Sequence, residues 1–146
     1  MCLILFDTEI KVAKEDIICY KVMEKRDKNL ISPYQNMCYE YGRAYVTETP
    51  IIVKYGIATR GYIEEGFHSF LKKEDAQYFA SNLQTWLYLP VKPRNHQVGM
   101  ECNPKVVTVK CLIPAGTRYA AGFFCEFGKS FDSFCSERII VLEEKI

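Results

Sequence analysis

The chain is built mostly of short apolar runs separated by polar or charged turns. Most runs are rich in β-branched and aromatic residues, which predicts β-strands because such side chains pack well on a pleated surface. The predicted strands cover residues 17–24, 39–46 with an interruption at Gly42, 50–56, 66–71, 105–113, 117–127 with a break at Gly122, and 138–142. The last run is continuously apolar, which is typical of a central strand buried on both faces.

One segment follows the period of a helix instead. Ala76, Phe79, Ala80 and Leu83 recur at positions i, i+3, i+4 and i+7, which places them on a single apolar face. Acidic residues occupy the first turn of the segment, where they complement the helix dipole, and prolines follow soon after its end. The pattern predicts one amphipathic helix over about 73–85.

Together these elements predict an α+β fold with a mostly antiparallel, twisted β-sheet and one clear helix. Residues 90–104 contain three prolines and one glycine, so we expect a surface loop there, and a second loop over 128–133. The chain shows no internal repeat and no linker. Its length is close to the commonest size of one domain, so residues 1–146 are expected to form a single domain.

The charge balance narrows the choice of partners. The formal net charge is +1 and the pI is about 7.5, which gives no general electrostatic attraction to polyanions. Nucleic acid is therefore not favoured as a partner. No stretch approaches the roughly 18 consecutive apolar residues of a membrane-spanning helix, so no membrane interaction is predicted.

The cysteines indicate the redox environment. The chain has seven, an odd number, and none of them forms a C-x-x-C pair, so no zinc or other metal site is predicted. Cys19 and Cys111 lie within apolar runs, where a free cysteine packs as a small apolar residue. Reduced thiols are typical of a reducing compartment, and a cytoplasmic location is expected.

Residues 66–70 (GFHSF) and 74–80 (EDAQYFA) carry a more specific signal. A strand of this form, followed by a helix with an alanine and an aromatic residue, resembles a signature of ADP-ribosyltransferase-like domains of the poly-ADP-ribose polymerase type. Two further segments are similar in order and placement. Residues 19–22 (CYKV) resemble the first core strand of that family, and residues 136–142 (SERIIVL) resemble the strand that opens with its catalytic glutamate.

The resemblance implies roles for five residues. His68 would stack on the nicotinamide ring, with Ser69 beside it, and Tyr20 and Lys21 would lie where the family grips NAD. Glu137 would be the catalytic residue that holds the ribose 2′-hydroxyl. The family has a tyrosine at the position of His68, and an arginine or a His-Gly pair at that of Lys21. NAD is expected as substrate or ligand, without a resident cofactor, and His68 and Glu137 are expected to converge in one cleft.

Two other hypotheses follow from the same residues. The chain would suit a non-catalytic binding or inhibitory module, such as an accessory protein of a phage or mobile element, that captures a protein partner or a small nucleotide ligand. It would also suit a homo-oligomer, because its aromatic content of 14% would permit a buried interface. A concave pocket holding His68 and Glu137 would favour the transferase hypothesis, and an exposed apolar patch would favour the other two.

Overall fold

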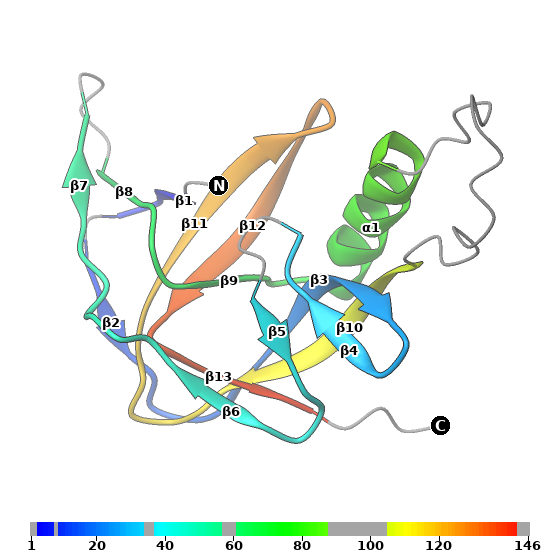
Figure 1. Cartoon of the computed structure of the whole chain (residues 1–146). Helices are drawn as coiled ribbons and strands as arrows, with labels where there is room; N and C mark the ends of the chain where they lie inside the picture. The colour runs from blue at the N-terminus through cyan, green and yellow to red at the C-terminus, as the bar shows by residue number, and fades with distance from the viewer. Residues whose placement is uncertain (1–2, 8, 34–36, 57–60, 88–104, 143–146) are drawn as a thin grey trace, which may run out of the picture.

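The computed structural model describes residues 3–7, 9–33, 37–56, 61–87 and 105–142. Within these ranges it contains one helix and a 13-stranded sheet whose strand pairings are antiparallel (Figure 1). The predicted α+β class is therefore confirmed. The elements are β1 (Leu3–Leu5), β2 (Lys11–Val12), β3 (Ile17–Arg26), β4 (Asn29–Ile31), β5 (Cys38–Tyr39), β6 (Ala44–Val46), β7 (Lys54–Tyr55), β8 (Gly61–Ile63), β9 (Phe67–Phe70), α1 (Lys73–Leu87), β10 (Lys105–Ile113), β11 (Arg118–Glu126), β12 (Lys129–Ser136) and β13 (Arg138–Val141).

Two long ladders form the body of the sheet. The strand order is β6-β13-β10-β3-β9-β12-β11-β1-β8-β7, with β4 and β5 extending from β3 and β2 pairing with β11. One ladder joins β3 to β10 and the other joins β11 to β12. The short strand β9 connects them, because it pairs with β3 at Phe70 and with β12 along its whole length.

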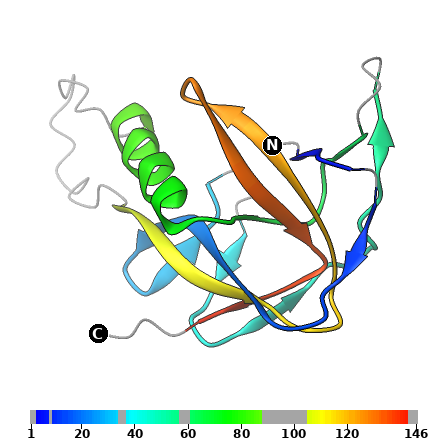
Figure 2. The same cartoon turned by 180° about the vertical axis from the view of Figure 1, so that it is seen from behind.

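Successive side chains of a strand point to opposite faces of the sheet. Different groups of side chains pack on the two faces. On the inner face, the sheet curves round a buried cluster that draws side chains from both ladders. On the outer face, α1 covers one end of the β3–β10 ladder, and it lies beside these strands in both views (Figures 1 and 2). The inner cluster consists of Cys19, Met23, Leu30, Tyr39, Phe67, Val109, Cys111, Ile113, Phe134, Ile139 and Val141.

The helix agrees with the prediction from the sequence. It spans Lys73–Leu87, and the four residues of the predicted apolar face are all buried. That face packs on Val22 and Val106 of the β3–β10 ladder and on three phenylalanines from β9, β11 and β12. Burial of such a face contributes most of the stability of a helix of this length, because an isolated short helix is marginal in water.

Three strand predictions were wrong. Residues 128–133 were expected to form a loop, yet β12 begins at Lys129, because pairing with β11 and β9 overrides the low strand propensity of its Ser and Asp residues. Within 50–56, only Lys54–Tyr55 is strand. The run at 138–142 is buried on one face only, because Ile140 of β13 lies on the outer face, beyond the cluster that packs under α1. The expected loop at 90–104 lies outside the described residues.

Gly122 does not interrupt its strand. β11 runs without a break from Arg118 to Glu126, and Gly122 pairs with Ser133 in the middle of the ladder. A Cβ atom at this position would collide with the backbone carbonyl of Ile4 in β1. The glycine is therefore explained by the close approach of β1 to β11 and not by a turn.

Candidate functional site

The structure pairs β9, the strand of His68, with β12, which ends just before Glu137. The strand that the resemblance assigns to Glu137, residues 136–142, contains β13, which pairs with β10 and β6 and not with β9. His68 lies opposite Cys135 in the β9–β12 pairing, and Glu137 follows two residues later, directly after β12 ends. His68 and Cys135 lie on the outer face, and Glu137 lies in the bend between β12 and β13. Its carboxylate is on the side of Cys135, because Ile51, whose N–H binds it, packs in the same buried cluster as Cys135. The described residues do not show that the two side chains meet in a cleft.

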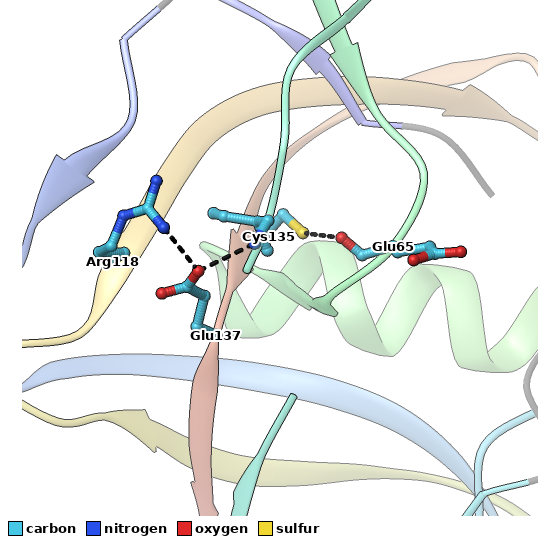
Figure 3. A network of polar contacts seen from close by, with 5 residues as sticks. Glu65, Arg118, Cys135 and Glu137 are labelled. Atoms are coloured by element: carbon cyan, nitrogen blue, oxygen red, sulfur yellow. Dashed lines mark hydrogen bonds and ion pairs between the residues drawn. The ribbon is translucent and has the colours of Figure 1, made fainter. Parts of the chain in front are cut away.

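The carboxylate of Glu137 is held by two internal donors. Its Oε2 accepts a hydrogen bond from the backbone N–H of Ile51 at 2.8 Å and pairs with Nη1 of Arg118 at 3.0 Å. Figure 3 shows Arg118 and the carboxylate facing each other beside β12. The carboxylate is mostly covered, with a side-chain exposure of 17% against 44% for Arg118. These contacts tie β12 to β11 and to the segment that precedes β7.

The imidazole of His68 is also engaged internally. Its Nε2 lies 3.2 Å from the carbonyl oxygen of Glu64, and its Nδ1 is buried without a hydrogen-bond partner among the described residues. Burial lowers the pKa of His68 to about 4, the hydrogen bond to Glu64 opposes this shift, and the charge of Lys21 adds to it. The ring is therefore neutral near pH 7, with the Nε2–H tautomer donating to Glu64.

Lys21 lies on the opposite face of the sheet from His68. Its side chain enters the inner cluster, where it is only 6% exposed. The ammonium donates to the backbone carbonyl of His68 at 2.6 Å and lies 5.5 Å from the centre of the Tyr39 ring. Burial lowers the pKa of Lys21, because no carboxylate pairs with it among the described residues. Lys21 therefore sits in the core and does not point toward Glu137.

The remaining two candidates also lie on different faces. Ser69 is buried on the inner-face side, where its hydroxyl lies near the Cys19 thiol; burial raises the pKa of that thiol, and the contact with Ser69 opposes the shift. Tyr20 is half-buried against the cluster beneath α1, on the outer face. The five candidates are thus close along the strands but divided between the two faces of the sheet, with Lys21 and Ser69 inside and the other three outside.

The buried thiols are poor nucleophiles. Burial raises the pKa of Cys19 to about 11 and those of Cys111 and Cys135 to about 12. All three are free cysteines, and Cys135 donates to the carbonyl oxygen of Glu65 (Figure 3). Because the thiolate is the reactive form, these residues act as core side chains, as the sequence predicts for Cys19 and Cys111.

The sequence did not identify the partners of Glu137. Arg118 lies 19 residues before Glu137 and Ile51 lies 86 residues before it. The charge of Arg118, at the start of a predicted strand, gave a weak signal for the first contact. A backbone N–H gives none, so only the tertiary structure could reveal the second.

We expect Glu137 to contribute to stability through these contacts. Glu137→Ala would leave the Ile51 N–H and the Arg118 guanidinium unpaired, at a cost of about 1–3 kcal/mol of unfolding free energy. Glu137→Gln keeps an acceptor for Ile51 and should cost less. Urea unfolding of the two variants measures both effects. Equal stability of wild type and Glu137→Ala would show that the network is not maintained in solution.

Within the described ranges, no three His, Cys, Asp or Glu side chains are placed to hold a metal ion. The helix among the described residues is too short and too polar to cross a membrane. Comparisons of this chain with protein-family models, with curated proteins and with solved structures find no match.

Proposed function

We propose that this protein is a non-catalytic binding module that docks another protein on the outer face of its sheet. The observation that carries the proposal is a row of apolar side chains across four neighbouring strands, outside the area that α1 covers. Ile18 of β3 lies opposite Leu112 of β10, Leu112 opposite Ile140 of β13, and Ile140 opposite Ala44 of β6. We call these four residues the apolar row.

The apolar row departs from the usual pattern of an antiparallel sheet. A face exposed to water normally carries polar side chains at alternate positions. Here Ile18 is 40% exposed, and Val46, which follows on the same face of β6, is 64% exposed. Contiguous apolar side chains on a surface are typical of interaction sites. The inner-face neighbours of the row are already buried, so the fold has a core without it.

The contacts of the candidate catalytic residues support a role without chemistry. The Glu137 carboxylate is engaged by Arg118 and Ile51, and the Lys21 ammonium is buried against the carbonyl of His68. NAD would have to displace these contacts before it could use the residues. Even an ADP-ribosyltransferase-like fold would not by itself imply the activity.

Calorimetric titration with NAD separates the binding module from the transferase hypothesis. We expect no saturable heat at millimolar NAD for the wild-type protein, and no release of nicotinamide over hours. The matched variants are His68→Ala and Glu137→Gln. Saturable binding by the wild type that either substitution weakens would contradict the proposal and return these residues to a nucleotide site.

A further inference from the structure

We propose that the partner on the apolar row is an amphipathic α-helix of another protein, with acidic side chains flanking its apolar stripe. This inference rests on the proposed docking function and adds the chemistry of the partner. It is argued from the helix that already packs on another part of this face, and from the charges on the two sides of the row.

Part of the outer face is already packed against a helix, α1. At the other end of the β3–β10 ladder, α1 buries Ala76, Phe79 and Leu83 against Val22 and Val106. A second helix could lie over Ile18 and Leu112 in the same way, because these residues belong to the same two strands and the same face. The strand alternation places Val22 and Ile18 four residues apart, on one side of β3.

Two exposed cations flank the apolar row, one on each side. Lys110 precedes Leu112 by two residues on β10, and Arg138 precedes Ile140 by two residues on β13, so both share the face of the row. Since β10 and β13 are antiparallel, the two cations lie on opposite sides of it. Neither forms an ion pair among the described residues.

Asp16 lies near the same face, and its carboxylate takes part in the turn after β10. The carboxylate of Asp16 accepts a hydrogen bond from the backbone N–H of Ala115, at the turn after β10. The apolar row is therefore flanked by the cation of Lys110 on one side and by that of Arg138 on the other, where the Asp16 carboxylate is already engaged by Ala115. A second copy of this chain would bring the same two cations to the interface, whereas a helix with Glu or Asp on both flanks would complement them.

Two synthetic 18-residue helical peptides test the inference. Both carry leucines at i, i+3, i+4 and i+7, one with glutamate flanks and the other with lysine flanks, and binding is followed by fluorescence anisotropy. We expect the glutamate peptide to bind saturably and the lysine peptide to bind about tenfold more weakly. Lys110→Glu with Arg138→Glu should reverse the preference, and Lys28→Glu, a charge change in the β3–β4 turn, should not.

The apolar contribution is tested with Ile18→Thr and Ile140→Thr, after urea unfolding has shown that these variants fold. Loss of binding of the glutamate peptide is expected. If neither peptide binds the wild-type protein, the docking function of this face is overturned. If both bind equally and the threonine variants bind neither, the face is an interaction site but the acidic partner is overturned. A wild-type dimer in sedimentation that Ile18→Thr dissociates would identify a second copy as the occupant and overturn the inference.

Discussion

Replacing Phe79 by alanine should lower the free energy of unfolding by about 3–5 kcal/mol. The side chain is buried, and its ring lies 5.2–5.7 Å from those of Phe70, Phe124, Phe127 and Phe131. Several of these pairs are edge-to-face, the geometry in which aromatic rings gain beyond simple burial. The substitution therefore removes a large apolar side chain and leaves a cavity between α1 and both ladders.

Urea unfolding of Phe79→Ala against wild type measures this effect. Gln77→Ala, an exposed position on the same helix, is the matched control and should change stability by less than about 0.5 kcal/mol. Similar small losses for both variants would mean that α1 is not packed on the sheet in solution. A large loss for Phe79→Ala alone would confirm that the aromatic cluster fixes the helix to the sheet.

Stability should also fall as the pH is lowered from about 6.5 toward 4, because of His68. Burial lowers the pKa of His68 from 6.5 to about 4 in the folded protein. Between these values the unfolded chain binds a proton that the folded chain does not, so protonation favours unfolding. The shift corresponds to a loss of at most about 3 kcal/mol, complete near pH 4 and absent above pH 7.

Urea unfolding of wild type and His68→Gln across pH 4–8 isolates this contribution. Glutamine can still donate to the Glu64 carbonyl but does not titrate in this range, and the carboxylates common to both proteins cancel in the difference. We expect the wild-type curve to fall more steeply than that of the variant below pH 6.5. Parallel curves would show that His68 titrates normally and that its ring is open to water.

The local sequence pattern predicted an element correctly where the burial of one of its faces fixes its secondary structure. The helical spacing from Ala76 to Leu83 predicted α1, because only one face of that segment can be buried. The β-branched run at 105–113 predicted β10, whose Val109, Cys111 and Ile113 lie in the inner cluster. In both cases the information lies in neighbouring residues.

The local pattern gave wrong predictions where pairing with strands distant in the sequence fixes the secondary structure. Residues 129–136 include three serines and an aspartate, yet pairing with β11 and β9 makes them the strand β12. Gly122 predicted a break in its strand, whereas it accommodates Ile4 of β1, which lies 118 residues earlier in the chain. Backbone hydrogen bonds to a partner strand do not depend on local composition, so such a strand leaves little trace in its own sequence.

Local sequence patterns established the fold class, the helix and most of the long strands, and the resemblance pointed to five candidate residues on three segments. The side of the sheet on which each of them lies, and its contacts, follow from the tertiary structure alone. That structure paired the strand of His68 with the one that ends just before Glu137, turned Lys21 into the core and joined Glu137 to Arg118 and Ile51. The physical reason is that periodicity specifies the faces of one strand, whereas long-range pairing specifies which strand lies beside it.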